Sequence, residues 1–372
     1  MKRFAFRKGL RLPISGEPSQ DVENGLAVRS VGLLGDDYLG LKPRLSVDEG
    51  DPVGPGSPIF NHKDLPDVQV VSPVAGRVKA INRGARRKLI SVEIDVGEGG
   101  ADPLDFSGVG DVGVPEGIVQ RLCAAGLWTS FRTRPYSRVP DPQTRPAAIY
   151  VTAMDTEPLA ADPAPIIQEA AEEFSEGLKA IATLSEGVTY LCHAEGADLP
   201  GGDLAGVEAV AFEGPHPAGL AGTHMHFLEP PGAGKTVWTI GYQDVIMIGR
   251  LMRTGRYDAS CVVALSGPVC AEPRMVRTVA GASMIELTAR DIPRDRPVRM
   301  ISGSVLSGRA GEGVGAYLGR YARQITLIEE DREQIPMGWI RPMPGKFAVQ
   351  PVLGSAWMQK LFPLTSNLNG GR

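Results

Sequence analysis

One segment in the middle of the chain limits the choice of fold more than any other. Residues 147–153 (AAIYVTA) form a continuous apolar run, which is typical of a strand buried on both faces. Asp162-Pro163 then predicts a helix start, because Asp can cap a helix and Pro suits its first position. Apolar residues continue at three- and four-residue steps to Leu184, and residues 187–194 predict a second strand. A strand–helix–strand unit implies parallel strands, so this region predicts an α/β domain.

The regions on either side have different patterns. Residues 90–96 alternate apolar and polar side chains, and turn signals are dense through the first hundred residues, which predicts a small β sandwich or barrel. Residues 97–115 are rich in Gly, Asp and Pro and predict a linker. Two more strands are predicted over residues 207–212 and 236–240, the latter leading into a helix over residues 242–253. After residue 258, short strands and one short helix predict a small α+β domain.

Charge and hydropathy exclude several classes of protein. The net charge is −4, without the basic excess of a nucleic-acid-binding protein, so no nucleic-acid partner is expected. The most apolar stretch, residues 238–252, is interrupted by Asp244 and Arg250 and is shorter than the roughly 20 apolar residues of a membrane span. The N-terminus lacks the apolar core of a signal peptide, so we expect a cytoplasmic protein. The Gly-Gly-Arg ending carries no helix or strand signal, and we expect more chain beyond it.

The cysteines are widely spaced. Cys123, Cys192, Cys261 and Cys270 form no C-x-x-C pair, which structural zinc and iron–sulfur sites usually contain. We therefore expect no iron–sulfur cluster and interpret the four as small buried apolar side chains.

Part of the N-terminal β region resembles the lipoyl and biotinyl carrier family, whose fold is a barrel-sandwich hybrid. The resemblance rests on SVDEGDPVGPGSPIF followed by VSPVAGRVKAI, two turn motifs that each lead into a strand. Asn61, His62, Lys63 and Asp64 stand where a carrier would place its modified lysine, but the neighbours that accompany that lysine are missing. We therefore expect the fold without the modification.

Two glycine-containing motifs are weak evidence for phosphate binding. Residues 230–236 (PPGAGKT) lack the first glycine of a phosphate loop, and Glu229 stands there instead, so a turn is predicted. Gly311, Gly313 and Ala316 fit a loose dinucleotide spacing but open no clear strand–helix unit.

Two polar clusters are candidate sites. His216, His224 and His226 lie close in sequence; on a strand the last two would share a face and could bind a metal, although hydrogen-bonded structural imidazoles are the alternative. Asp155 and Glu157 follow a predicted buried strand, where α/β folds bind ligands, but an acidic pair on a loop is often only solvated.

A third cluster combines aromatic rings with guanidinium groups. Such a mixture can stack on a planar ligand and donate hydrogen bonds to its carbonyl oxygens, or it can form a protein interface. The residues are Trp128, Phe131, Arg132, Arg134, Tyr136 and Arg138.

Ordered sequence blocks along nearly the whole chain resemble the A-subunit family of the sodium-translocating NADH:quinone reductase. The blocks are KGLRLPISG, VGLLGDDYLGLKP, INRGARRKLISVEI, FRTRPYSRVP, YVTAMDTEPLAADP, GPHPAGLAGTHMHF, GYQDVIMIGRLM, VVALSGP, VRTVAGAS and ISGSVLSG. The resemblance implies a multidomain α+β protein with a barrel-sandwich hybrid over residues 1–100, a Rossmann-like α/β domain over 101–257 and a β-grasp, SLBB-like domain over 258–330. Residues 331–372 would then be a shortened C-terminal extension.

The resemblance also implies kinship with flavin-binding subunits of other redox complexes. Asp155, Glu157 and Pro158 match the acidic loop of those relatives and would be vestigial flavin-loop positions here. Bulky Leu127 and Trp128 replace the glycine-rich loop, which needs close backbone approach to phosphate. We therefore expect no bound flavin.

The implied complex passes electrons from NADH to ubiquinone and exports sodium. The chain would be a peripheral subunit on the inner face of the bacterial inner membrane, docked to the other subunits, among them the membrane-embedded B-subunit, with no catalytic residues of its own. Ubiquinone binding is a hypothesis for two segments: Leu33, Leu34 and Tyr38, and the aromatic–arginine cluster. The alternatives are an independent flavin- or NAD-dependent oxidoreductase, a purely structural scaffold, and a carrier or metal-binding module.

Overall fold

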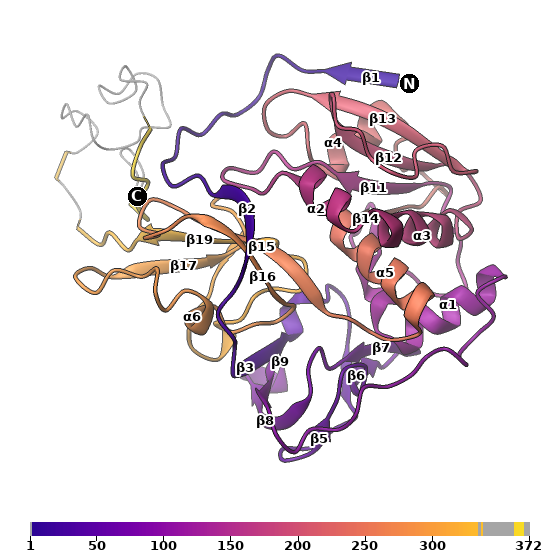
Figure 1. Cartoon of the computed structure of the whole chain (residues 1–372), viewed down its shortest axis with the longest axis horizontal. Helices are drawn as coiled ribbons and strands as arrows, with labels where there is room; N and C mark the ends of the chain where they lie inside the picture. Colours follow the sequence, from indigo (N-terminus) through magenta and orange to yellow (C-terminus); the bar gives the residue numbers. More distant parts are fainter. Residues whose placement is uncertain (1, 334–335, 338–360, 368–372) are drawn as a thin grey trace.

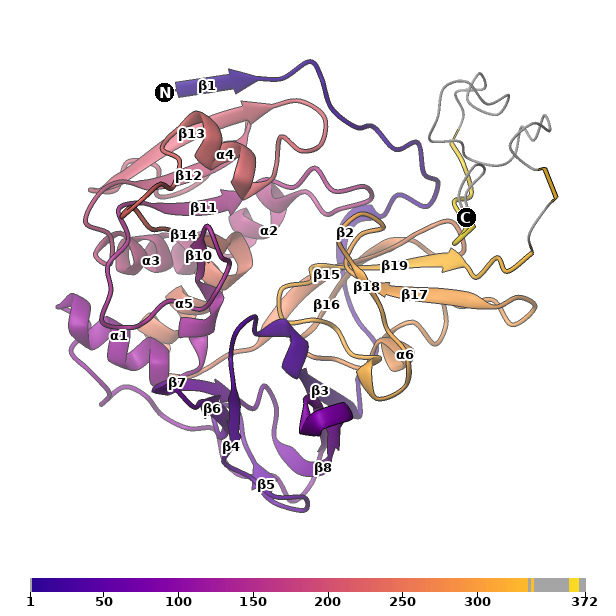
Figure 2. The same cartoon turned by 180° about the vertical axis from the view of Figure 1, so that it is seen from behind.

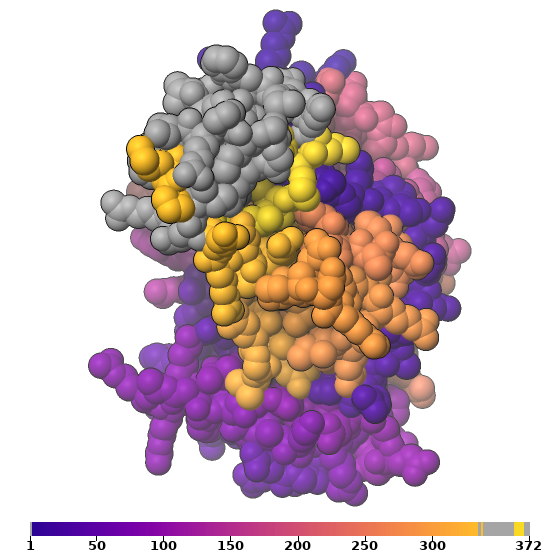
Figure 3. Space-filling view, turned by 90° about the vertical axis from the view of Figure 1, so that its left-hand side faces the viewer, coloured from indigo at the N-terminus to yellow at the C-terminus, as the bar shows by residue number. Residues whose placement is uncertain are grey.

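The computed structural model describes residues 2–333, 336–337 and 361–367. Its four sheets lie in three parts of the molecule (Figure 1). Two small sheets form the N-terminal β domain, a six-stranded sheet with helices forms the α/β domain, and another six-stranded sheet forms the third domain. In a space-filling view the orange third domain lies directly above the purple N-terminal β domain (Figure 3). Within the described ranges, no helix has the length and apolar character needed to cross a membrane.

The N-terminal β domain encloses one apolar core between its two sheets. One sheet has the order β3 (Ser30–Leu34), β9 (Leu89–Val96), β8 (Gly76–Arg83) and β5 (Pro52–Val53), and the other has β4 (Pro43–Leu45), β6 (Pro58–His62) and β7 (Leu65–Val71). Two short 3-10 segments, η1 (Gly35–Asp37) and η2 (Ala85–Arg87), join these strands. Phe60 and Val70 from one sheet meet Val92 and Ile94 from the other in the core. Lys63 and Asp64 form the turn between β6 and β7.

The α/β domain contains the predicted parallel strands. The sheet order is β1 (Lys2–Ala5), β13 (Val207–Glu213), β12 (Thr189–Ala194), β11 (Ile149–Ala153), β14 (Val237–Gly241) and β10 (Arg132–Arg134). Every neighbouring pair is parallel except β10 with β14, which is antiparallel. The strand–helix–strand prediction is confirmed, since β11 and β12 pair in parallel register from Ile149 and Thr189 onward.

Helices cover both faces of this sheet. The elements are α1 (Pro115–Ala124), η3 (Leu127–Ser130), α2 (Pro163–Glu169), α3 (Ala171–Ala182), α4 (Ala221–Phe227) and α5 (Tyr242–Thr254). Because successive strand residues point to opposite faces, Val151 packs in the core with α3 and α5, whereas Tyr150 packs with Met225 of α4. Asp162 caps α2 as predicted, accepting a hydrogen bond from the Ala164 amide at 3.0 Å. The single predicted helix is two, because Ala170 leaves the helical conformation (φ −119°, ψ 40°).

Two glycines let α3 and α5 approach closely. A Cβ on Gly177 would collide with the backbone carbonyl of Val245, and one on Gly249 would collide with that of Glu173. Side chains at these positions would force the helices apart, since packed interiors leave no free volume.

The third domain is strand-rich, as predicted. Its sheet order is β18 (Arg309–Ala310), β17 (Val298–Ser302), β19 (Gln324–Glu329), β15 (Ser260–Ser266), β16 (Arg274–Val279) and β2 (Ser19–Asn24), accompanied by α6 (Met284–Leu287) and η4 (Gly313–Gly315). Val263 and Leu265 of β15 belong to the same apolar core as Ile248 and Leu251 of α5. The α/β and third domains therefore share a continuous core.

The first residues of the chain leave the N-terminal β domain. β1 pairs in parallel with β13, and β2 pairs in parallel with β16, so residues 2–24 run along both other domains (Figures 1 and 2). Neither strand is predicted from the sequence. The Phe362 amide donates to the Pro13 carbonyl at 2.7 Å. Most of the predicted C-terminal extension, 331–372, lies outside the described residues.

Candidate functional site

A cavity of about 230 Å³ opens at the carboxyl ends of β11 and β14, beside the first turn of α5. We call it the strand-end cavity. Thr152 and Gly241 line it from the strand ends, and Tyr321 and Arg323 reach it from the third domain. In open α/β sheets, ligands bind at this edge of the strands. The cavity therefore lies at the position expected for a ligand site.

Asp155, like Asp244 of α5, is a carboxylate residue that lines the strand-end cavity. The surrounding protein desolvates it and raises its pKa to about 7, although the Glu157 amide lowers this value by donating a 2.8 Å hydrogen bond to Oδ1. The many protein atoms around the carboxyl group raise its pKa even though the residue keeps exposed surface. A carboxyl group with a pKa near neutrality can accept or donate a proton at the pH of the cell.

Arg132 of β10 brings a guanidinium group to the same cavity. Its Nη2 donates to the Asp37 carbonyl at 3.0 Å and its Nη1 to the Ser137 carbonyl at 3.2 Å. The guanidinium lies 3.7 Å above the ring centre of Tyr321, a cation–π contact that fixes its plane. Its buried Nε has no hydrogen-bond partner among the described residues. Arg132 therefore keeps one unpaired donor, but that nitrogen is enclosed by protein atoms.

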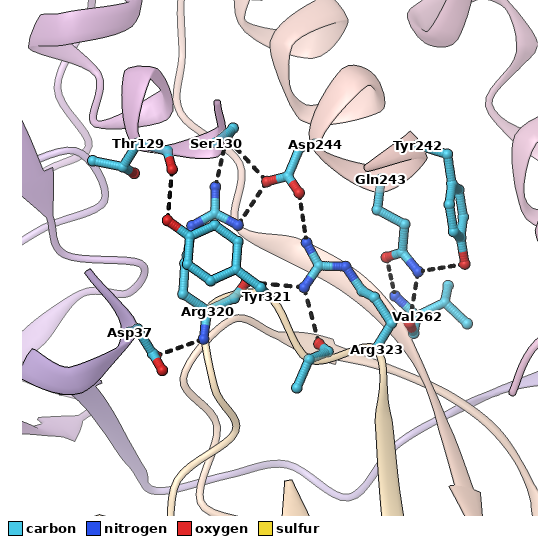
Figure 4. A network of polar contacts seen from close by, with 11 residues as sticks. Asp37, Thr129, Ser130, Tyr242, Gln243, Asp244, Val262, Arg320, Tyr321 and Arg323 are labelled. Atoms are coloured by element: carbon cyan, nitrogen blue, oxygen red, sulfur yellow. Dashed lines mark hydrogen bonds and ion pairs between the residues drawn. The ribbon is translucent and has the colours of Figure 1, made fainter. Parts of the chain in front are cut away.

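A buried ionic network lies next to the cavity, between the α/β and third domains (Figure 4). Asp244 of α5 forms an ion pair with Arg320, whose Nη1 lies 2.6 Å from Oδ1, and accepts a hydrogen bond from Arg323 Nη2 at 3.1 Å. Ser130 donates to Asp244 at 3.0 Å and accepts from Arg320 Nη2 at 2.8 Å. Burial alone would raise the pKa of Asp244, but the two guanidinium groups outweigh it and hold the pKa below its usual value.

Asp37 extends the network to the N-terminal β domain. Its carboxylate accepts a hydrogen bond from the Arg320 amide at 2.7 Å and forms an ion pair with Arg309, whose Nη2 lies 2.7 Å from Oδ1. Tyr321 adds a hydrogen bond of 2.6 Å to the Thr129 carbonyl. Residues from all three domains thus converge within one hydrogen-bonded group beside the cavity.

The sequence matches models of one protein family along most of its length. The matches are the NqrA N-terminal barrel-sandwich hybrid domain over residues 4–97, the NqrA second alpha/beta domain over 115–257 and the NQRA C-terminal domain, of SLBB type, over 262–312. Similar curated proteins are named as the A-subunit of the Na(+)-translocating NADH-quinone reductase. Those of Neisseria gonorrhoeae FA 1090 (46% identity, 98% of this chain and 82% of the relative), Pasteurella multocida (46%, 99% and 83%) and Rhodopirellula baltica (44%, 98% and 81%) are examples.

The chain belongs to the NqrA family, the A-subunit family of the Na⁺-translocating NADH-quinone reductase.

The family models confirm the predicted fold class, a barrel-sandwich hybrid followed by an α/β domain and an SLBB-type domain. A solved NAD⁺-reducing [NiFe]-hydrogenase shares 11% identity with a TM-score of 0.40, covering 59% of this chain and 47% of its own. That degree of likeness is too low to support an inference about either fold or function.

For this chain of the NqrA family, the structure brings the two segments of the quinone hypothesis together. Leu33, Leu34 and Tyr38 are buried in the N-terminal β domain, and the Tyr38 ring lies 6.5 Å from that of Tyr321. Arg132 connects the second segment to the first through the Asp37 carbonyl. The segments therefore meet where the three domains join.

The aromatic residues of the second segment do not form one surface. Trp128 and Phe131 are fully buried and pack against Trp238, with ring centres 5.4 and 5.5 Å from it. Trp128 Nε1 donates to the Pro140 carbonyl at 2.9 Å. By contrast, the Tyr136 side chain is 72% exposed. Trp128 and Phe131 thus stabilise the domain core and have no free face for a ligand.

The arginines of that segment also differ from one another in how far they are exposed to solvent. Arg132 and Arg134 are partly buried, whereas Arg138, beyond the β10 turn, is exposed. Burial, and then the nearby Arg132 charge, lowers the pKa of Arg134. Of the predicted aromatic–arginine cluster, only Arg132 lines the strand-end cavity.

The histidine prediction is wrong in its secondary structure. His224 and His226 lie on helix α4, where residues two apart point in different directions. His224 is buried, its Nε2 lies 3.0 Å from the Ala218 carbonyl, and burial lowers its pKa to about 4. His226 is exposed, and His216 Nδ1 lies 3.3 Å from the Thr156 hydroxyl. Within the described part of the chain, no three His, Cys, Asp or Glu side chains are grouped to hold a metal ion.

Glu157 does not line the strand-end cavity but bonds to the third domain. Its carboxylate accepts a hydrogen bond from the Ser304 hydroxyl at 2.5 Å, and the neighbouring Pro158 carbonyl accepts from Gln324 at 2.8 Å. The acidic loop predicted from the sequence therefore holds two domains together on one side and supplies Asp155 to the cavity on the other.

Several site residues are absent from the sequence prediction. Asp244 enters that prediction only as an interruption of an apolar stretch, although a charge on the buried face of a helix is itself a signal. Arg320 and Arg323 carry no local signal, because only the three-dimensional fold places them beside Asp244.

Proposed function

We propose that the chain works as the A-subunit of a Na⁺-translocating NADH-quinone reductase and contributes a binding site for the ubiquinone headgroup. It would lie on the inner face of the bacterial inner membrane and dock on the membrane subunits, the B-subunit among them. The single observation that carries the quinone site is the strand-end cavity, with the Arg132 guanidinium group in its lining. The family membership supports the place in the complex.

The chemistry of the cavity suits a quinone ring. A quinone is planar and uncharged, with carbonyl oxygens that accept hydrogen bonds, so it needs donors and apolar walls. Arg132 and Arg323 bring guanidinium groups to the lining, and Met154 and Ile240 bring apolar side chains. Arginine is suited to this role because its planar group donates hydrogen bonds in fixed directions and is always charged.

Asp155 supplies a group for proton transfer. Reduction of a quinone to a quinol adds a proton at each carbonyl oxygen, while the electrons would come from other subunits of the complex. A proton donor works best when its pKa lies near the working pH, and that of Asp155 is raised to about 7. We assign Asp155 the role of holding a proton at the cavity.

We also propose that the chain binds neither a flavin nor an iron–sulfur cluster. Leu127 and Trp128, which replace the glycine-rich loop of flavin-binding relatives, form part of η3 and are fully buried. Bulky side chains in this position leave the backbone unable to approach a phosphate. The purified chain should therefore be colourless.

The experiment is reconstitution of membranes from cells that lack their own NqrA protein. Added chain should restore Na⁺-dependent reduction of ubiquinone by NADH, and failure to do so would refute the place in the complex.

An Ala221→Trp variant, which fills the strand-end cavity, should bind the membranes but restore little activity. The control is Ala197→Trp, on a partly buried turn that does not line the cavity. If Ala221→Trp restored full activity, the quinone site would be refuted and only a scaffold role would remain for the chain. NADH oxidation by the isolated chain would favour an independent oxidoreductase.

A further inference from the structure

A second, larger cavity lies between the N-terminal β domain and helix α1. It has a volume of about 880 Å³ and shares no lining residue with the strand-end cavity. One wall is the β6–β7 hairpin and the opposite wall is α1, which lie side by side in both cartoon views (Figures 1 and 2). The linker after residue 100 and the loop at residues 142–145 complete the walls. We call this cavity the α1 cleft.

The lining of the α1 cleft is more apolar than polar, although the side-chain amides of Gln69, Gln120 and Gln143 also belong to it. Leu104, Phe106 and Val109 come from the linker, and Val119 and Ala124 come from α1. Leu104 is 40% exposed, a large apolar side chain without a covering neighbour on one side. Burial raises the pKa of the Cys123 thiol to about 12, so it stays uncharged and behaves as apolar wall. Small-molecule sites have this size range and composition.

Buried polar contacts hold the walls in place. Arg121 of α1 donates hydrogen bonds to three linker carbonyls, those of Ser107, Val109 and Gly110, at 2.7, 2.9 and 3.0 Å. The loop on the other side is held by the bond from Trp128 Nε1 to the Pro140 carbonyl. A cleft whose walls are fixed in advance loses little entropy when a ligand binds.

The charged groups of the cleft define the ligand further. Arg145 Nη2 donates to Glu116 at 2.7 Å, while its buried Nη1 has no hydrogen-bond partner among the described residues. Asp67 adds a second carboxylate to the lining. With two carboxylates and one guanidinium, the cleft repels anions, while the Arg145 side chain, which is 24% exposed, can donate a hydrogen bond to an uncharged acceptor.

We propose that the α1 cleft is a binding site for an uncharged, mainly apolar molecule that carries a carbonyl group, with the carbonyl oxygen facing Arg145. The apolar body lies against the linker and α1. This site is separate from the proposed quinone cavity, so an experiment can refute either proposal without refuting the other.

The test uses prodan, an uncharged fluorescent naphthyl ketone, titrated into the purified full chain. One saturable site with a blue-shifted emission is expected. Leu104→Glu places a charge on the apolar wall and should weaken the binding of prodan at least tenfold. The matched control is Leu306→Glu, at a similarly exposed leucine (42%) in the third domain, which should leave binding unchanged.

Competition identifies the ligand class. Methyl dodecanoate, an uncharged ester, should displace prodan, whereas the dodecanoate anion should displace it at least tenfold less well. Absence of saturable prodan binding, equal binding by the parent and Leu104→Glu, or equal competition by ester and anion would each overturn the proposal. The Ala221→Trp variant should bind prodan normally, which separates this site from the strand-end cavity.

Discussion

Asp244 of helix α5 and Arg320 of the third domain form a buried ion pair, with Oδ1 and Nη1 2.6 Å apart. Arg323 binds the other carboxylate oxygen, and the Arg320 amide continues the network to Asp37. Since these residues lie in three domains, this one carboxylate fixes how the domains meet around the strand-end cavity.

Asp244→Asn should lower the free energy of unfolding by about 3–5 kcal/mol, because it leaves two buried guanidinium groups without a counter-charge. Urea unfolding measures this. The control is Asp258→Asn, whose pair with Arg250 lies near the surface, and its effect should stay below about 1 kcal/mol. Similar losses in both variants would contradict the central role of Asp244.

The same pair predicts an acid-sensitive contribution to stability. The pKa of Asp244 is lowered in the folded chain, so its stabilisation is present above the unfolded value of about 3.9 and is lost as the pH falls through the lower folded value. The difference in unfolding free energy between parent and Asp244→Asn should therefore be constant near neutral pH and shrink below about pH 4. A difference that did not change with acid would contradict the ionised state assigned to Asp244.

The raised pKa of Asp155 predicts a pH dependence of stability opposite to that of Asp244. Its folded pKa of about 7 lies above the unfolded value, so ionisation costs stability increasingly as the pH rises from about 4 to 7, and the cost is constant above that. Asp155→Asn should thus be more stable than the parent at pH 8, with a smaller gain at pH 5. Denaturant unfolding at both pH values provides the measurement, and an equal gain at both would argue against the raised pKa.

Helix packing gives a test that is independent of charge. Gly249→Ala places a methyl group against the Glu173 carbonyl and should destabilise the chain by about 1–3 kcal/mol. Gly222→Ala, on α4 with no atom within contact distance of the new methyl, should be neutral or stabilising by up to about 1 kcal/mol. A thermal melt of each variant distinguishes the two outcomes.

We expect His216, His224 and His226 to bind no metal ion. His224 is buried against the Ala218 carbonyl and His226 points away from it on α4. Neither a chelator nor added zinc should change the melting temperature of the purified chain. A zinc-dependent rise would show that the three histidines rearrange to bind the metal.

The parts of the fold that local sequence patterns encode could be predicted, whereas the pairing of strands far apart in the sequence could not. The capped helix at Asp162 and the apolar run ending at Ala153 are encoded by neighbouring residues, so the α/β unit could be predicted. β1 pairs with β13 more than 200 residues later, a choice set by sheet register that no local signal contains.

The site was predictable only in part for the same reason. Asp155 follows a recognisable strand and does line the cavity. Trp128 and Arg132 look alike as ligand candidates in the sequence, yet the fold buries the indole in the core and directs the guanidinium to the cavity. Exposure of a side chain in an irregular segment depends on tertiary packing, which spacing alone does not encode.

Above all, we propose that the strand-end cavity binds the ubiquinone headgroup. Calorimetric titration of the purified chain with a short-chain ubiquinone tests it most directly, with Ala221→Trp and its control Ala197→Trp measured alongside. We expect saturable heat at one site in the parent and the control, and none in Ala221→Trp. Equal heat in all three proteins, or no saturable heat in the parent, would contradict it.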